Sequence, residues 1–157
     1  MEEFRQQNVV DFFRNQGKLQ LYFSIYTPPR LYKTEVLVIW GPTGVSKSKK
    51  AFELVQDHTF WVKPPGQWFD GYRGQEIAIF DEFSGDLPWE LMLQPIDRYP
   101  MQVPVKGAFA QWLLQLVVIT SSLPPHAWYA DREFPVLERR LSHNLQMVIT
   151  ITISFGI

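Results

Sequence analysis

Cysteine is absent from this sequence of 157 residues, and histidine occurs only three times. Without cysteine the chain has no disulfide framework, no thiolate zinc site and no cysteine nucleophile. His58, His126 and His143 lie far apart and form neither an H-x-H nor an H-E-x-x-H pattern, so they do not predict a metal site. Candidate chemistry has to be sought in other residue types.

A strong charge of one sign and a long apolar run are missing as well. The formal net charge is -1, so no overall positive field draws nucleic acid to the monomer, and such binding would need local loops or an oligomer. No apolar run approaches the roughly eighteen residues of a membrane span, and the N-terminus is charged and polar. We expect an intracellular protein with no membrane partner.

What the sequence does contain is an alternation of strand-like and helix-like segments. Apolar segments rich in β-branched residues predict four strands, at Val36–Trp40, Ile77–Phe80, Leu116–Thr120 and Met147–Ile153. Helix-compatible stretches follow Lys47 and cover Trp89–Asp97 and Asp131–Leu141. The alternation predicts an α/β domain at residues 28–157, with a central, mainly parallel sheet flanked by helices.

A different kind of segment precedes this domain. Apolar residues between Glu2 and Asn15 recur loosely at helical spacing, which predicts a short amphipathic helix, and Gly17 offers a stop. Tyr26–Arg30 contains two consecutive prolines, which neither continue a helix nor pair inside a sheet. We therefore expect residues 1–27 to form a helical segment and linker, with oligomerisation as its candidate role.

The first predicted strand runs directly into a phosphate-binding pattern. The residues after Trp40 match G-x-x-x-x-G-K-[ST] except at Ser46, where glycine is expected. In such a loop backbone amides surround the phosphates, Lys47 reaches the β and γ phosphates, and the Ser48 hydroxyl meets Mg²⁺. A side chain at Ser46 adds bulk beside the phosphates and disfavours the required backbone angles. The residues assigned to ATP binding are Gly41, Pro42, Thr43, Gly44, Val45, Ser46, Lys47 and Ser48.

A second pattern supplies acids. The apolar strand Ile77–Phe80 ends in Asp81 and Glu82, about thirty residues after the phosphate loop. In this position Asp81 would hold Mg²⁺ and Glu82 would orient or deprotonate the attacking water. Acids after an apolar strand are otherwise most often solvated loop residues. Their distance from the loop favours the catalytic interpretation.

Six further stretches narrow the field beyond a phosphate loop. They are Pro28-Pro29-Arg30, Lys33-Thr34-Glu35, Trp68-Phe69-Asp70-Gly71-Tyr72, Leu87-Pro88-Trp89, Asp97-Arg98-Tyr99-Pro100 and Val105-Lys106-Gly107. With these stretches, residues from about Pro28 to Ile149 resemble the replication-associated proteins of circular single-stranded DNA viruses, especially the circovirus-like group. The C-terminal half of those proteins is a superfamily 3 helicase, a P-loop NTPase of the AAA+ type.

The resemblance implies a homo-oligomeric ring of six subunits, which hydrolyses ATP and moves pore loops along single-stranded DNA. Lys106 and Gly107 then fall on the loop that contacts the nucleic-acid backbone, where phosphate contacts are independent of sequence. Ser122 takes the place of the asparagine that senses the γ-phosphate. Arg139 or Arg140 corresponds to the arginine finger that acts on a neighbour's nucleotide.

Plainer interpretations of these residues stay open. Lys106 also fits a solvated hairpin tip, and Arg139 and Arg140 also fit cations at the negative end of a surface helix. Ser46 and Ser122 depart from the family pattern, and Pro95 falls inside the segment that the family uses as a helix, where it should shorten or kink it.

The departures leave two hypotheses, a divergent working ATPase and DNA helicase, or a catalytically impaired nucleotide-binding or ring-interaction module. RNA is an alternative substrate, because helicases of positive-strand RNA viruses share the two nucleotide motifs. The H-x-H pair and catalytic tyrosine of the family's nicking domain have no match here, so we expect no nicking activity. The resemblance also implies that the protein works in the host cell nucleus during rolling-circle replication.

Overall fold

The computed structural model describes residues 27–130, 134–142 and 148–150, together with Asn15 and Lys18. Apart from Asn15, the predicted N-terminal helix lies outside these ranges. So do the two ends of the last predicted strand and the first three residues of the last predicted helix. No helix within the described ranges is long and apolar enough to cross a membrane.

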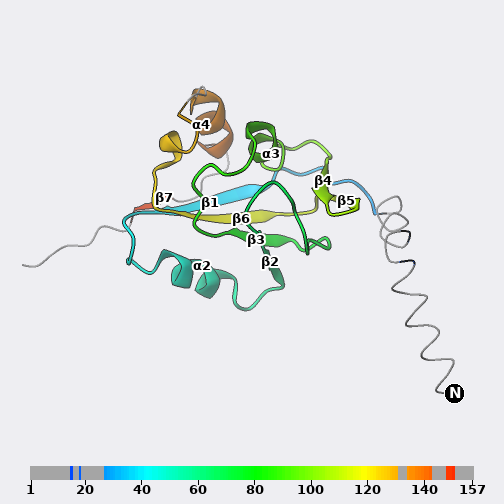
Figure 1. Ribbon diagram of the computed structural model, residues 1–157, viewed down its shortest axis with the longest axis horizontal. Coiled ribbons are helices and arrows are strands. Elements are labelled where there is room, and N and C mark those ends of the chain that lie inside the picture. Colours follow the sequence, from blue (N-terminus) through cyan, green and yellow to red (C-terminus); the bar gives the residue numbers. More distant parts are fainter. Residues whose placement is uncertain (1–14, 16–17, 19–26, 131–133, 143–147, 151–157) are drawn as a thin grey trace, which may run out of the picture.

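A five-stranded parallel sheet forms the centre of the domain (Figure 1). Its strands are β1 (Glu35–Trp40), β2 (Phe60–Val62), β3 (Ile77–Phe80), β6 (Leu116–Ser121) and β7 (Val148–Thr150). They lie in the order β2-β3-β6-β1-β7, and every neighbouring pair is parallel. The predicted α/β fold is confirmed. Because the strands are parallel, the loops that follow β1, β3 and β6 meet at one edge of the sheet.

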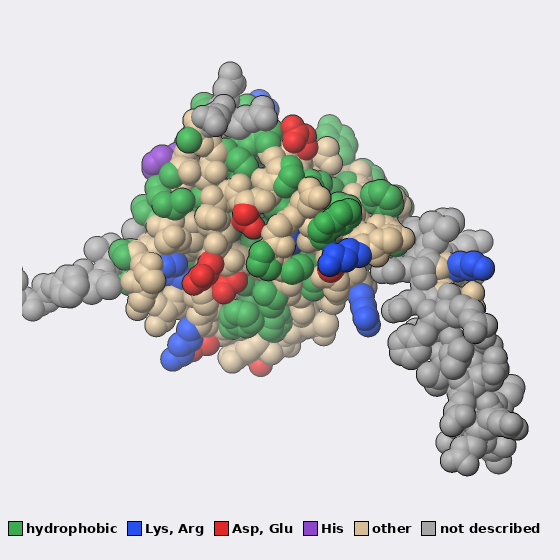
Figure 2. All heavy atoms as spheres, in the orientation of Figure 1, with side chains coloured by type: hydrophobic (Ala, Val, Ile, Leu, Met, Phe, Trp, Pro, Cys, Tyr) green, Lys and Arg blue, Asp and Glu red, His purple; other side chains and the backbone are tan. Residues whose placement is uncertain are grey.

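Helices cover the sheet on both faces, as the unbroken apolar run of β6 requires. The helix α2 (Lys47–Val55) lies on one face, and α3 (Trp89–Leu93) and α4 (Phe134–Ser142) lie on the other (Figure 1). A 3-10 turn, η1 (Pro125–Ala127), precedes α4. Figure 2 shows lysine and arginine side chains spread singly over the visible face, in keeping with the small net charge.

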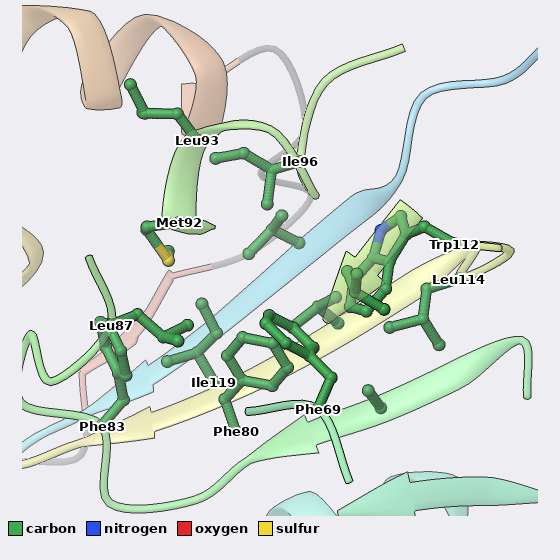
Figure 3. Close-up of a cluster of buried hydrophobic side chains, with 14 of the residues drawn as sticks. Phe69, Phe80, Phe83, Leu87, Met92, Leu93, Ile96, Trp112, Leu114 and Ile119 are labelled. Atoms are coloured by element: carbon green, nitrogen blue, oxygen red, sulfur yellow. The ribbon is translucent and has the colours of Figure 1, made fainter. Parts of the chain in front are cut away.

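Two apolar clusters fill the layers between sheet and helices. The smaller one joins α2 to the sheet through Ile39, Ala51, Val55, Ile79 and Val118. The larger one lies on the opposite face and contains most of the buried aromatic rings (Figure 3). Ring centroids of Phe69 and Tyr72 lie 5.4 Å and 5.2 Å from that of Trp112. Much of the aromatic content of the chain therefore serves the core.

The helix predicted from Trp89 to Asp97 is shorter in the structure, as expected from Pro95 within that segment. The helix α3 ends at Leu93, and its last backbone bond runs from Gln94 N to Glu90 O at 3.1 Å. Pro95 has no amide to continue the ladder, and its ring also restricts the residue before it. Its carbonyl instead accepts a hydrogen bond from Trp112 Nε1 at 2.9 Å.

An antiparallel hairpin that the sequence patterns did not predict stands beside the sheet. Its strands are β4 (Gln102–Val105) and β5 (Ala108–Gln111). Lys106 and Gly107 form the two-residue tip, where Gly107 takes a φ of 79° that glycine adopts without steric cost. The interpretation of Lys106 as a hairpin-tip residue is therefore confirmed, and a contact of Lys106 with nucleic acid is compatible with that position.

Candidate functional site

A cavity of about 430 Å³ opens at the carboxyl edge of the sheet. Its walls come from the loop after β1, from the turn after β3 and from the residue after β6. The lining residues are Thr43, Gly44, Ser46, Lys47, Ser48, Glu82 and Ser122. The structure thus brings together, around one space, residues that the sequence indicated in three separate motifs.

Lys47 is held inside the phosphate loop. The residue is 8% exposed, and its Nζ donates hydrogen bonds to the carbonyls of Gly41 at 2.9 Å and Pro42 at 2.8 Å. Both acceptors are neutral, whereas a phosphate oxygen would make a charge-assisted and stronger bond with the ammonium. A nucleotide in the cavity could therefore take Lys47 from its present partners.

The cavity is also where the backbone is strained. Within the described ranges, Ser46 with φ 60° and Glu82 with φ 51° are the only non-glycine residues at positive φ, and both line this cavity. Such a conformation costs on the order of 1–3 kcal/mol and gathers at functional sites. Ser46 occupies the position where the loop pattern expects glycine, and the structure gives the reason, since this position is left-handed.

The turn that carries the two acids is fastened by Thr120, a residue that sequence reasoning did not assign to the site. The Thr120 hydroxyl donates to Asp81 Oδ1 at 2.6 Å and accepts from the Glu82 backbone N at 2.8 Å. The Phe83 backbone N donates to the Thr120 carbonyl at 2.8 Å. In the sequence Thr120 reads only as the last residue of an apolar strand, so no signal marked this role.

Asp81 lies beside the cavity rather than in its wall. It follows β3, which is separated from β1 by β6 alone, so it shares the carboxyl edge with Lys47. Alternation along the strand places it on the face of Ile79, the face that α2 covers. Asp81 lines an adjoining cavity of about 480 Å³, and Glu82 lines both.

The donor set fits the magnesium ion that a bound nucleoside triphosphate carries. Magnesium prefers hard oxygen ligands and takes several of them from phosphate and water, with one or two from protein side chains. The Ser48 hydroxyl in the cavity wall and the Asp81 carboxylate beside it are ligands of this kind. Among the described residues, no group of three or more His, Cys, Asp or Glu side chains gathers as a separate metal site.

The adjoining cavity holds a buried lysine. Lys63 Nζ donates to the carbonyls of Pro64 and Gly66 and lies 5.0 Å from the centroid of the Phe69 ring. Burial lowers the pKa of Lys63, while the negative charges of Asp86 and Asp70 act in the opposite direction. The neutral carbonyls and the ring face thus provide the local partners for this ammonium.

The remaining predicted site residues do not line the cavity of about 430 Å³ of their own chain. Arg139 and Arg140 are in the last turn of α4, which also agrees with the plainer interpretation of cations at a helix end. Arg140 Nη2 lies 3.3 Å from Asp97 Oδ2. Lys106, at the hairpin tip with Gly107, lies 3.5 Å from Asp70 Oδ2 through its Nζ.

Stretches that carry the family resemblance contact one another in space. The Arg30 guanidinium is buried and donates to the carbonyls of Pro95 at 2.8 Å, Gln94 at 3.0 Å and Tyr99 at 3.1 Å, as well as to the Thr34 hydroxyl. The proline-arginine stretch before β1 thus fastens the segment after α3. Two of the stretches on which the resemblance depends therefore lie in direct contact.

The strand order, the loop after β1 and the acids after β3 define a P-loop α/β domain. A protein-family model described as RNA helicase matches residues 37–122, more than half of the chain, and the chain belongs to that family. The resemblance to the superfamily 3 helicase domain of circovirus replication proteins is confirmed by relatives of this name.

Three replication-associated proteins illustrate the relationship. The one from beak and feather disease virus is 44% identical over 116 residues, which cover 74% of this chain and 39% of that protein. The one from canary circovirus is 42% identical over 129 residues, covering 81% and 44%. The one from porcine circovirus 2 is 39% identical over 136 residues, covering 85% and 43%. The chain thus spans less than half the length of these relatives.

Among solved structures, NtrX from Brucella abortus matches 92% of this chain and 40% of its own, at 16% sequence identity and a TM-score of 0.45. The fold assignment depends on the strand order and the family match.

Proposed function

We propose that this domain hydrolyses ATP with Mg²⁺ and couples hydrolysis to movement along single-stranded DNA, as the helicase part of a viral replication initiator. One observation carries the proposal: Lys47, Ser48, Glu82 and Ser122 surround a single cavity although they follow three different strands. The relatives from circoviruses, which are named replication-associated proteins, support it as well.

Each side chain has a part that its position allows. Lys47 would exchange the Gly41 and Pro42 carbonyls for phosphate oxygens, and Ser48 and Asp81 would hold the magnesium ion, which neutralises phosphate charge when bound. Glu82, fixed by the Thr120 hydroxyl, would orient the attacking water. Ser122 would present a hydroxyl to the γ-phosphate from the end of β6.

A homo-oligomeric ring, with six subunits as the proposed number, would complete the site. Arg139 and Arg140 do not line the cavity of their own chain, so a contribution to catalysis would have to reach a neighbour's nucleotide. Head-to-tail contacts between identical subunits close into rings, and an arginine supplied across such a contact stabilises transition-state charge. The proposed setting is the host cell nucleus.

The test of the nucleotide site is Lys47→Ala in the purified chain. We expect ATP turnover to disappear, because the ammonium in the cavity is lost. Lys49→Ala is the matched control: Lys49 lies on the same helix but is exposed, and pairs only with Glu53 at 3.8 Å among the interactions described. Turnover that survives Lys47→Ala would overturn the proposal. No turnover in the unaltered chain would favour the impaired interaction module instead.

RNA is the second candidate substrate, since the matching family model is described as RNA helicase. The resemblance to the replication proteins of circular single-stranded DNA viruses, which the circovirus relatives support, favours DNA. Unwinding of matched DNA and RNA duplexes with the same single-stranded tail separates the two, and we expect the DNA duplex to open faster.

A further inference from the structure

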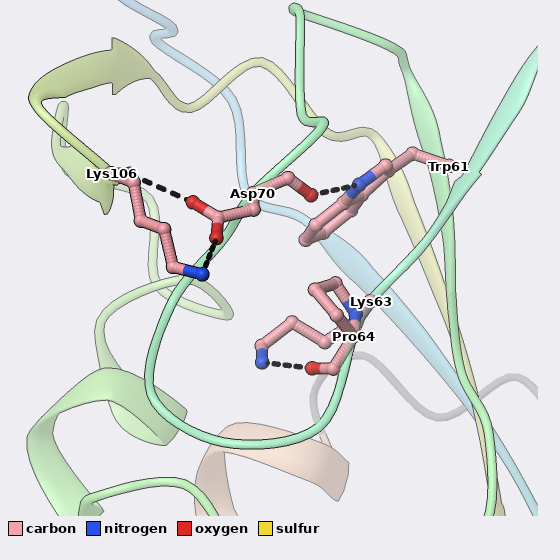
Figure 4. A network of polar contacts seen from close by, with 5 residues as sticks. All are labelled: Trp61, Lys63, Pro64, Asp70 and Lys106. Atoms are coloured by element: carbon pink, nitrogen blue, oxygen red, sulfur yellow. Dashed lines mark hydrogen bonds and ion pairs between the residues drawn. The ribbon is translucent and has the colours of Figure 1, made fainter.

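The tip of the β4–β5 hairpin is fastened by one carboxylate (Figure 4). Asp70 Oδ1 accepts a hydrogen bond from the Lys106 backbone N at 2.7 Å, and Asp70 Oδ2 lies 3.5 Å from Lys106 Nζ. The same side chain therefore fixes the backbone of the tip and neutralises the charge that the tip presents.

Asp70 is itself anchored to the core. The backbone carbonyl of Asp70 accepts a hydrogen bond from Trp61 Nε1 at 3.0 Å. The backbone N of the neighbouring Phe69 donates to the Pro104 carbonyl of β4 at 2.9 Å. Trp61 and Phe69 are both buried, and their rings stack with centroids 6.0 Å apart. The position of the hairpin tip is thus set by the core through Asp70.

The ion pair is open to competition. The Lys106 side chain is 77% exposed and the Asp70 side chain 33%, so a ligand can reach the ammonium without moving the backbone. Exposed pairs of this kind contribute little to folding. A phosphate that approaches Lys106 meets the negative charge of Asp70 at the same place, and the two compete for one cation.

We propose that Asp70 is a positioning residue for nucleic-acid binding, which holds the Lys106 backbone while its charge competes with phosphate for the Lys106 ammonium. The inference rests on the proposed contact between Lys106 and nucleic acid. Because Asp70 competes for the ammonium, each hairpin binds nucleic acid more weakly than Lys106 without Asp70 would. A weaker contact of this kind suits a hairpin that must release the nucleic acid and bind it again.

Asp70→Asn tests the charge, because asparagine keeps a side-chain oxygen that can accept the hydrogen bond from the Lys106 backbone N. Binding of a fluorescent oligothymidylate to the full chain would be followed by anisotropy over a range of salt concentrations. We expect tighter binding at low salt, by about two- to five-fold, the range that exposed ion pairs allow. We also expect a steeper dependence of log affinity on log salt, by up to about 0.7 for one additional phosphate neutralised.

Controls separate this effect from a general change of charge. Asp57→Asn removes the same charge from an exposed position after α2 and should leave affinity and salt slope as they are. In the Lys106→Ala background, Asp70→Asn should bring no gain. A gain that persists there, or unchanged binding by Asp70→Asn with Lys106 present, would overturn the proposal.

Asp70→Ala tests positioning, since alanine removes the amide acceptor together with the charge. We expect the salt slope of Asp70→Asn but weaker binding, and equal affinities of the two variants would refute the positioning role. Lys106→Ala alone distinguishes this inference from the proposed function. If that variant binds oligothymidylate as well as the unaltered chain, the contact of Lys106 with nucleic acid is wrong. If it binds more weakly while Asp70→Asn changes nothing, only the role of Asp70 is wrong.

Discussion

Ser46 and Glu82 carry strain in the two turns that would face each other across a nucleotide. A left-handed backbone at a residue with a side chain costs free energy that the rest of the fold has to offset. At Ser46 this cost arises because the residue is not glycine, so one substitution, Ser46→Gly, should remove the cost.

Ser46→Gly should therefore raise the free energy of unfolding by about 1 kcal/mol and tighten binding of Mg-ATP. Urea unfolding and calorimetric titration measure the two effects. Ser84→Gly is the matched control: Ser84 is not at positive φ, so the same change should lower stability by about 0.4–1 kcal/mol, because glycine gives the unfolded chain more freedom to lose. A Ser46→Gly variant that is less stable and binds no better would show that the serine has a role of its own.

Thr120 acts on the site through Asp81 and Glu82, and its hydroxyl can be removed with little change of shape. In Thr120→Val the Asp81 carboxylate loses its donor and the Glu82 amide loses its acceptor. We expect kcat for ATP to fall by about 100-fold, since small displacements of catalytic groups have effects of that size, with a much smaller change in KM.

Thr120→Ser is the conservative control and should restore most of the rate, because serine supplies the same oxygen. Stability should fall by about 1–3 kcal/mol in the valine variant alone. An unchanged kcat in Thr120→Val would mean that the turn holds the acids without this hydroxyl.

At the scale of elements, the strands that are apolar runs rich in β-branched residues were predictable from the sequence, and the other strands were not. The segment Ile77–Phe80 was predicted with its observed bounds, and the strands around Val36–Trp40 and Leu116–Thr120 differ from observation by one residue. The strand Phe60–Val62 has three residues, too few for periodicity, and Pro104 inside β4 argues against a strand. Tertiary contacts, which the sequence does not display, decide both.

The candidate site divides in the same way. Residues of the phosphate loop could be predicted because glycine, lysine and serine at fixed spacing have few other uses. The two hydrogen bonds of the Thr120 hydroxyl join residues that are 38 and 39 positions apart in the sequence. The contact between Asp70 and Lys106 joins residues that are 36 positions apart. Such pairings depend on strand order and loop placement, and no local pattern announces them.

Arg30 provides the test of how elements are fastened to one another. Arg30→Ala removes one donor from each of the Gln94, Pro95 and Tyr99 carbonyls, although Gln94 keeps the Asp97 backbone N and Pro95 keeps Trp112 Nε1. We expect the free energy of unfolding to fall by about 3 kcal/mol, because the charge-assisted bonds of a buried guanidinium are lost. Arg30→Lys should recover less than half of the loss, because one ammonium cannot match the fork of a guanidinium.

Urea unfolding measures these losses. Arg98→Ala is the control from the same segment: Arg98 is exposed, and its removal should change stability by less than about 0.5 kcal/mol. Equal losses for Arg30→Ala and Arg98→Ala would mean that the buried guanidinium does not fasten the segment.

At the scale of the whole molecule, the two candidate functions lie at opposite ends of the sheet. In Figure 1 the loop before α2 follows the carboxyl end of β1, while the hairpin stands near the amino ends of the strands. The segment from Lys63 to Asp70 runs from the carboxyl end of β2 to the hairpin tip, with Lys63 at the adjoining cavity and Asp70 at Lys106. This segment thus joins the adjoining cavity to the hairpin tip within one subunit.

The proposed ring predicts complementation between two inactive chains. Lys47→Ala should lack turnover because its own cavity has no lysine to bind phosphate. The double variant Arg139→Ala/Arg140→Ala should lack turnover because it supplies no arginine to the cavity of a neighbouring subunit. In an equal mixture, a working cavity needs an intact lysine on one side and intact arginines on the other. If subunits assemble at random, this leaves about one quarter of the interfaces active, so about a quarter of the unaltered rate should return.

The control for that experiment mixes the double variant with a chain that carries all three substitutions, where no interface is complete and no rate should return. Arg140 pairs with Asp97, so thermal unfolding must show that the double variant is folded before its inactivity is assigned to catalysis. If the double variant alone retains the full rate, neither arginine acts across an interface. If it is folded and inactive but the first mixture stays inactive, the arginines act within their own chain, and the ring would not be needed for hydrolysis.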